Sequence, residues 1–285
     1  SGTITVTPSL NGCTGTPTTF TITVDPPPTM DPVADQELCE GENTAAINFT
    51  SPFAGATFDW LNDNTGIGLT ANGTGSISSF VGANGGAAPI TGTVSVVPTL
   101  NGCIGVPQQF TITVNPIPTV DAGANVVVCD GDQITLTATG ANTYQWAPNL
   151  TNGQPFVPTY SGMYYVVGAD ANGCVNVDSV DVTIEPIPAV SFTADTTQGC
   201  EGLTVTFTNT TPGAFTDCFW TFSNGATATG CGSVSVTFNN AGLFDATLTT
   251  VSAAGCSNTV TYTDYIYIED NPVAAFTPSS SVVSV

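Results

Sequence analysis

The chain has 285 residues, among them 22 acidic residues and no Lys, Arg or His, so its formal net charge at pH 7 is −22. Binding of nucleic acid or of anionic membrane surfaces depends on cationic side chains. Catalysis by a Ser–His pair, a Lys Schiff base, a P-loop or an arginine finger needs residues that are missing here. The apolar fraction of 41% still allows packed cores. We therefore expect a folded protein that is not an enzyme, with no nucleic-acid partner and, for want of a long apolar run, no membrane insertion.

The start of the chain is repeated further on. Residues 1–30 and 91–120 are identical at 18 of 30 positions without a gap. The shared residues include Leu-Asn-Gly-Cys, which ends at Cys13 and Cys103, and the strand-like run Phe-Thr-Ile-Thr-Val before a proline. Weaker copies of the Gly-Cys signature occur at Cys174 and Cys256. The chain therefore contains an internal repeat.

Proline junctions separate the copies, because proline ends strands and stiffens short linkers. After each of the first three junctions comes a Cys-acid-Gly sequence, at Cys39, Cys129 and Cys200, and then a tryptophan. We predict the C-terminal strands of a preceding repeat at 1–27, repeats at 28–117, 118–187 and 188–271, and the start of a further repeat at 272–285. The chain is thus expected to be part of a longer array.

Within the copies the hydrophobic pattern has period 2, as in residues 109–114, 133–139 and 204–208. Gly, Asn and Pro interrupt these runs at short spacing, and no amphipathic helix is visible. Units of this length with several short strands are typical of β-sandwiches. The predicted fold class is all-β, a tandem array of β-sandwiches.

Nine cysteines predict a disulfide framework, because zinc would need C-x-x-C pairs or nearby His, and neither exists. The repeat suggests that each Cys-acid-Gly cysteine bonds to the Gly-Cys cysteine of its own unit. Cys13 is then left over, with its partner upstream. The predicted bonds are Cys39–Cys103, Cys129–Cys174, Cys200–Cys256 and a local Cys218–Cys231. Disulfides place the protein in an extracellular or periplasmic compartment.

The layout of cysteine, tryptophan and cysteine over alternating strands resembles immunoglobulin-like (Ig-like) sandwiches. Residues 188–271 resemble a PKD domain, with Trp-x-Phe-x-x-Gly at 220–225 and an aromatic-Gly turn at 240–245. PKD domains usually carry a charged Asp-Gly pair after the Trp-Phe stretch, and this sequence differs from them there. Units 28–117 and 118–187 are similar to the Ig-like and PKD-like repeats of large Bacteroidetes surface proteins. The resemblance implies a type IX-secreted, cell-surface or gliding-motility adhesin, or the shaft of a filament.

Calcium is the metal that an acidic chain without His could bind, because it prefers several oxygen ligands. Asp130 and Asp132 share one turn, and Asp170 and Asp178 belong to the same unit. These four residues are a candidate calcium site, and no other cofactor is expected. The alternative to a calcium site is that these residues are ordinary solvated carboxylates in turns. A catalytic pair of carboxylates is a further possibility, and solvated turn carboxylates are preferred over it.

Two short sequences, Asp178-Ser179-Val180 and Asp195-Thr196-Thr197, resemble the O-glycan acceptor pattern of Bacteroidetes secreted proteins. Ser179 and Thr196 are therefore candidate glycosylation sites. The three tryptophans are interpreted as core residues rather than sugar-stacking platforms. The expected exposed aromatic residues are Tyr144, Tyr160, Tyr164 and Tyr165.

We expect a structural segment of an extracellular cell-surface adhesin or filament, a disulfide-stapled acidic β-sandwich shaft. Its partners would be adjacent repeats of the same long chain, and surface glycans or like chains in a filament. One alternative is a filament subunit that polymerises by strand addition through 1–27 and 272–285. Another is a carbohydrate-binding accessory module of a secreted hydrolase.

Overall fold

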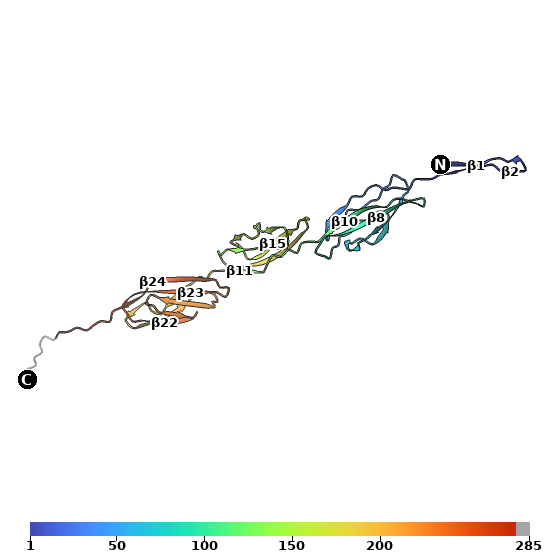
Figure 1. The fold of residues 1–285 in the computed structure, drawn as a ribbon. Coiled ribbons are helices and arrows are strands. Elements are labelled where there is room, and N and C mark those ends of the chain that lie inside the picture. Colours follow the sequence, from blue (N-terminus) through green and yellow to red (C-terminus); the bar gives the residue numbers. More distant parts are fainter. Residues whose placement is uncertain (278–285) are drawn as a thin grey trace, which may run out of the picture. The chain divides into compact units, whose positions relative to one another are not determined.

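Residues 1–277 of a computed structural model are described, and they form an all-β protein of several β-sandwiches (Figure 1). The only helical turn within this range is the 3-10 turn η1 (Thr65–Ile67). No helix in the described part of the chain is long and apolar enough to cross a membrane. The predicted start of a further repeat at 272–285 is described only as far as Thr277, and residues 272–277 form no strand; the rest lies outside the described residues.

The first residues form a hairpin without a core of its own. It consists of β1 (Gly2–Val6), β2 (Ser9–Leu10), β3 (Cys13–Thr14) and β4 (Thr18–Ile22), with β1 antiparallel to β4. Ile4 lies opposite Phe20, and their side chains are 42% and 50% exposed. At the equivalent positions 90 residues later, Val94 and Phe110 are 0% and 3% exposed. The hairpin therefore presents to solvent an apolar face that its copy buries in a core.

The first complete sandwich has a sheet in the order β5-β10-β8-β6-β7, with β9 paired to β8. Two isolated bridges, from Asn43 to Val81 and from Ile47 to Ile77, mark its other layer. Its hydrophobic core extends from Met30 to Val114 and includes Trp60. The strands are β5 (Gln36–Cys39), β6 (Thr57–Asn62), β7 (Asn72–Thr74), β8 (Ile90–Leu100), β9 (Cys103–Ile104) and β10 (Gln108–Asn115).

The second sandwich pairs a four-stranded sheet, in the order β11-β16-β15-β13, with the two-stranded sheet β12-β14. Its core extends from Ala122 to Val182 around Trp146. The strands are β11 (Val126–Cys129), β12 (Ile134–Thr135), β13 (Thr143–Ala147), β14 (Pro155–Phe156), β15 (Gly162–Ala169) and β16 (Val175–Glu185).

The third sandwich packs a five-stranded sheet, in the order β18-β24-β23-β20-β21, on the three-stranded sheet β17-β19-β22. Its core extends from Phe192 to Ile268 around Trp220. The strands are β17 (Phe192–Ala194), β18 (Gln198–Cys200), β19 (Leu203–Asn209), β20 (Asp217–Phe222), β21 (Thr227–Thr229), β22 (Ser233–Phe238), β23 (Gly242–Val251) and β24 (Ser257–Glu269).

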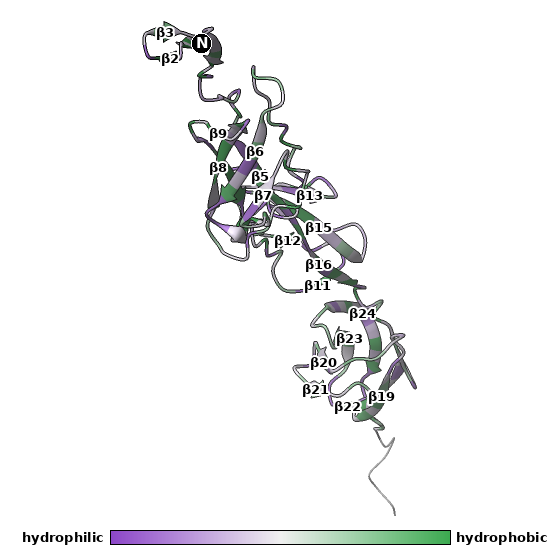
Figure 2. Cartoon of the chain, turned by 90° about the vertical axis from the view of Figure 1, so that its right-hand side faces the viewer, coloured by the Kyte–Doolittle hydropathy of each residue, from purple (hydrophilic) through white to green (hydrophobic). Residues whose placement is uncertain are grey.

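Alternation of apolar and polar residues explains why these segments are strands. Along β8, residues 92, 94, 96 and 98 are buried, with Val94 and Val96 fully enclosed, and the half-buried residues between them are Thr93, Ser95 and Val97. Successive side chains of a strand point to opposite faces, so this pattern buries one face and leaves the other to water. Figure 2 shows apolar segments along β8, β15 and β16.

The residues also group into two compact units. The first comprises 1–119 with the segments 140–143 and 168–176, and the second comprises 120–139, 144–167 and 177–285. The turn between β15 and β16 therefore belongs to the first unit, although the core of the second sandwich belongs to the second unit. The sequence-based domain boundaries stay a proposal.

Candidate functional site: the cysteine turns

The Cys-acid-Gly sequence has the same local structure in all three sandwiches. Its cysteine ends a short strand that pairs in parallel with the last strand of the sandwich, with Cys39 opposite Asn115, Cys129 opposite Glu185 and Cys200 opposite Glu269. The amide of the following acidic residue donates to the carbonyl of that same partner, over 2.8, 2.9 and 3.1 Å. Each cysteine is therefore fixed at the C-terminal end of the last strand.

Glycine is required at the third position of these turns. Gly41, Gly131 and Gly202 have φ angles of 84°, 86° and 88°. This left-handed region is open to glycine without steric cost and disfavours residues with a side chain. The turn leaves the strand directly after the cysteine, so the cysteine is held at the edge of the sandwich rather than inside it.

The Gly-Cys sequence lies in the turn that leads into the last strand. In the second sandwich, the Asp170 carboxylate accepts hydrogen bonds from the amides of Asn172 and Cys174, both at 2.9 Å. In the third, the Ser252 hydroxyl accepts from the Cys256 amide at 3.2 Å. Cys103 and Cys13 occupy a tighter two-residue Asn-Gly hairpin instead.

An asparagine two residues after the bonded Gly-Cys cysteine holds the turn to the proline junction. The Nδ2 of Asn176 donates to the Pro118 carbonyl at 2.9 Å, and the Nδ2 of Asn258 donates to the Pro188 carbonyl at 2.8 Å. The first sandwich has Gly105 at this position, and a Cβ there would lie 2.0 Å from the Pro28 carbonyl oxygen. In all three copies the residue after the turn is therefore in close contact with the junction.

The disulfides of the structure connect different sandwiches. A Cys-acid-Gly cysteine bonds to the Gly-Cys cysteine of the next sandwich, and the Cα atoms are 5.6 Å apart in both cases. The local bond within the third sandwich, with a Cα separation of 4.9 Å, is the one that the sequence predicted. The three disulfides are Cys39–Cys174, Cys129–Cys256 and Cys218–Cys231.

The other predicted pairings, Cys39–Cys103, Cys129–Cys174 and Cys200–Cys256, differ from the structure. The reason is the length of the last strand. Cys129 lies opposite Glu185 at one end of β16, whereas Cys174 precedes Val175 at the other end. A strand rises about 3.3 Å per residue, so the 11 residues from Cys174 to Glu185 separate the two cysteines by about 35 Å, whereas disulfides need Cα atoms within about 7 Å. Cys103 and Cys200, with Cys13, are exposed free thiols here.

The four candidate calcium ligands do not come together, for the same reason. Asp130 and Asp132 lie in the turn after Cys129, while Asp170 lies in the turn before β16, at its opposite end. The described residues contain no group of three or more acidic or cysteine side chains that could hold a metal ion. The predicted four-residue site is therefore not formed, and calcium binding by either end separately stays a prediction.

Asp178 has a structural task. Its Oδ2 accepts a hydrogen bond from the Ala122 amide at 2.7 Å. Hydrogen bonds from the backbone of Ala122 and then Ser179 lower the pKa of the Asp178 carboxyl below its ordinary value. In the first sandwich the Asp35 carboxylate plays a similar part, because the backbone and side chain of Thr111 lower its pKa.

The candidate glycosylation sites are half-buried. Ser179 lies on β16, and Thr196 lies between β17 and β18, where its hydroxyl donates to the Gln198 carbonyl at 3.1 Å. Nothing in the structure tests whether either hydroxyl carries a glycan, so both sites stay predictions.

The tryptophans are core residues, as predicted. Trp60, Trp146 and Trp220 are 7%, 2% and 1% exposed. Among the tyrosines, Tyr160 and Tyr165 are exposed and Tyr144 is half-buried.

Tyr164 was expected at the surface but is 1% exposed. Its ring stacks on Tyr160 with centroids 4.9 Å apart, and its hydroxyl donates to the Tyr160 carbonyl. Burial, with a smaller effect of Tyr160, raises the pKa of the Tyr164 hydroxyl. Period-2 alternation along β15 would have placed it inside, since Val166 is also buried.

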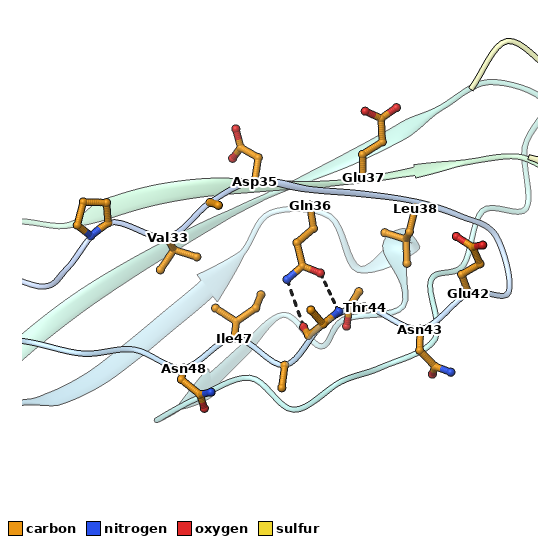
Figure 3. Close-up of a pocket in the computed structure, with 14 residues that line it drawn as sticks. Val33, Asp35, Gln36, Glu37, Leu38, Glu42, Asn43, Thr44, Ile47 and Asn48 are labelled. Carbon is orange, nitrogen blue, oxygen red and sulfur yellow. Dashed lines mark hydrogen bonds between the residues drawn. The ribbon is translucent and has the colours of Figure 1, made fainter. Parts of the chain in front are cut away.

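A groove of about 660 Å³ lies in the first sandwich between residues 32–38 and 42–48 (Figure 3). The Gln36 side chain crosses it, donating to the Ala45 carbonyl at 3.2 Å and accepting from the Ala45 amide at 3.0 Å. The carboxylates of Asp35 and Glu37 point away and bond to the Thr111 amide and the Asn115 side chain. The groove thus has a structural bridge across it rather than convergent free polar groups.

Comparison with known proteins gives a family for one part of the chain. Residues 185–268 match the family model of the PKD domain. This range covers the third core, which extends from Phe192 to Ile268, and it agrees with the sequence resemblance. No curated protein matches the chain.

Solved structures of tandem domains are similar in fold only. The titin I-band fragment I67–I69 is 12% identical and aligns over 87% of this chain and 100% of its own, with a TM-score of 0.42. The eight N-terminal Ig domains of Down syndrome cell adhesion molecule are 12% identical and align over 86% of this chain and 37% of their own, with a TM-score of 0.41. Mouse cadherin-23 EC22–24 is 14% identical and aligns over 87% of this chain and 100% of its own, with a TM-score of 0.36.

Proposed function

We propose that this chain is a non-catalytic structural segment of an extracellular cell-surface adhesin or filament. The observation that carries the proposal is the pair of disulfides that connect consecutive sandwiches, Cys39–Cys174 and Cys129–Cys256. A single domain gains nothing from a bond to its neighbour's turn beyond what a local disulfide supplies. A chain that must transmit tension does gain, because the bond carries force past a proline junction.

The two connecting disulfides overlap along the chain. Cys129 lies inside the loop closed by Cys39 and Cys174, and Cys174 lies inside the loop closed by Cys129 and Cys256. The second sandwich is therefore covalently attached to both neighbours in addition to the main chain. If the strands of the array unfold under load, the shortest covalent path between Cys39 and Cys256 uses both bonds and runs only through residues 129–174.

Its composition suits permanent exposure. Without Lys or Arg the chain has no cleavage site for trypsin-like enzymes, and 22 acidic residues without any basic one make neighbouring molecules repel each other. Disulfides indicate an oxidising compartment. Type IX secretion and a role in gliding motility rest on the sequence resemblance to Bacteroidetes surface repeats and form the finer part of the proposal.

The experiment is antibody labelling of intact cells that produce the protein. An antibody against the third sandwich should label the surface of unpermeabilised cells, and cells lacking the gene should attach less well to surfaces. As a control, an antibody against a periplasmic or cytoplasmic protein should not label the unpermeabilised cells. Labelling that appears only after permeabilisation would contradict the proposal.

The N-terminal hairpin favours one second candidate, a filament subunit. Its exposed apolar face, with Ile4 and Phe20, corresponds to the core positions Val94 and Phe110. We propose that residues 1–27 complete a sandwich from another repeat, either of the same chain or of a second copy. Sedimentation separates the two sources: a second copy gives polymers that Phe20→Asp dissolves, whereas the same-chain interpretation gives a monomer with or without the substitution.

A further inference from the structure

We infer that Cys200 and Cys103 are the two open ends of a disulfide ladder that continues through further sandwiches. Cys200 would bond to the Gly-Cys cysteine of a following sandwich, and Cys103 to the Cys-acid-Gly cysteine of a preceding one. The inference rests on the proposed structural role and names the partner that this role requires: a further copy of the repeat in the same polypeptide.

The first step is the direction of the bonds. Every connecting disulfide in the structure runs from a Cys-acid-Gly turn to a Gly-Cys turn one sandwich later. The second sandwich uses both of its positions, Cys129 forward and Cys174 backward. The first sandwich uses only its forward cysteine, Cys39, and the third only its backward cysteine, Cys256. The unused positions are Cys103 and Cys200, both exposed thiols.

The second step is the local geometry of Cys200. Like Cys39 and Cys129, it ends a short strand parallel to the last strand and lies opposite that strand's last residue. The next amide donates to the same carbonyl, and the following glycine, Gly202, has a φ of 88°. The main chain that positions two bonded cysteines is thus present unchanged at Cys200, and only the bond is missing.

The third step is Cys103, which is placed slightly differently. It follows a glycine, Gly102, as Cys174 and Cys256 do, but it lies in the short strand β9, in a tighter hairpin where Leu100 pairs with Cys103, and the last strand begins only at Gln108. Cys13 has the same hairpin. Two independent copies keep this turn with an exposed thiol, so the tighter hairpin is a second form of the Gly-Cys position rather than a loss of it.

The chemistry is ordinary oxidation of two thiols. The Cys200 sulfur and the partner sulfur form one S–S bond, and two protons and two electrons leave. A disulfide oxidant, such as the oxidised active site of a thiol-disulfide oxidoreductase, accepts the electrons by exchange through a mixed disulfide. Exposure of the thiol allows this exchange.

The test is peptide mapping of the protein isolated from its own compartment. Free thiols are blocked with iodoacetamide, and pepsin at acidic pH then digests the protein without reduction. We expect Cys200 to be unmodified and linked to a peptide that contains Gly-Cys, and Cys103 to be linked to one that contains Cys-acid-Gly. A link from Cys200 to Cys13 or Cys103 would show that the partner is a second copy, contradicting the same-polypeptide assignment. Alkylated Cys200, or a Cys200–Cys200 bond, would overturn the inference as a whole.

A variant gives a second measurement. Cys200→Ser should leave one Gly-Cys thiol newly reactive toward iodoacetamide outside residues 1–285, whereas the matched control Cys218→Ser should free only Cys231. If Cys200→Ser frees no thiol, Cys200 had no partner and the inference fails. If antibodies label the cell surface but Cys200 is a free thiol, the disulfide ladder is refuted and the proposed function is not. If Cys200 is bonded but antibodies do not label the cell surface, the proposed function is refuted and the ladder is not.

Discussion

Cys39 and Cys174 are 135 residues apart in sequence and belong to consecutive sandwiches, yet their Cα atoms lie 5.6 Å apart and their sulfurs are bonded. The equivalent relationship recurs between Cys129 and Cys256. A repeat whose disulfides leave each unit makes the junction, rather than the single sandwich, the element on which mechanical behaviour depends.

Stretching of single molecules should reveal the bypass. With all disulfides intact, the shortest covalent path follows residues 1–39, then runs backwards from 174 to 129, and then follows 256–285, about 40% of the chain. The fully extended oxidised chain should therefore be about two fifths as long as the reduced one, since each residue spans about 3.3–3.6 Å at most. Equal extension before and after reduction would mean that the connecting bonds do not carry load.

Two phenylalanines at equivalent positions of the repeat form a matched pair for stability. Phe110→Ala should lower the free energy of unfolding of the first sandwich by about 3–5 kcal/mol, because it leaves a cavity in the core. Phe20→Ala, at a 50% exposed position, should change it by less than about 0.5 kcal/mol. Urea unfolding measures both. A comparable loss for Phe20→Ala would show that the hairpin face is already covered.

Asp178 gives a pH-dependent prediction. Its folded pKa is depressed by amides of Ala122 and Ser179, so its stabilising effect is present above the unfolded pKa of about 3.9 and is lost as pH falls through the lower folded pKa. Asp178→Asn should therefore lower the melting temperature at pH 7, and the difference should vanish under strongly acidic conditions. The control is Asp217→Asn, at an exposed position of β20. A difference that persists at low pH would show that the charge is not the cause.

Paired hydroxyls line the outward faces of the third sandwich. Thr247 and Thr261 lie opposite each other on β23 and β24, with their hydroxyl oxygens 2.9 Å apart. Substituting each by Val, singly and together, should give a coupling energy of about 0.2–1 kcal/mol. Thr247 combined with Thr206, on the other sheet, should behave additively. If the Thr247 and Thr261 substitutions are also additive, their hydroxyl pair does not stabilise the sandwich.

Sequence reasoning could predict the sandwiches because burial alternates along strands such as β8, and it could predict Cys218–Cys231 because those residues are close in the chain. It could not predict the connecting bonds. Repeat spacing shows that two cysteines recur together, but not that Cys129 and Cys174 stand at opposite ends of β16. Strand register decides this, and the parallel pairing of β11 with β16 is visible only in the structure. The grouping of the four candidate calcium ligands was wrong for the same reason, because Asp130 and Asp170 are separated by that strand.

The most direct test of the connected array is non-reducing peptide mapping of the oxidised 285-residue chain, with pepsin at acidic pH to prevent exchange. The predicted linked peptides contain Cys39 with Cys174, Cys129 with Cys256 and Cys218 with Cys231. Peptides that link Cys39 to Cys103 and Cys129 to Cys174 would instead confine each disulfide to one sandwich and contradict the array.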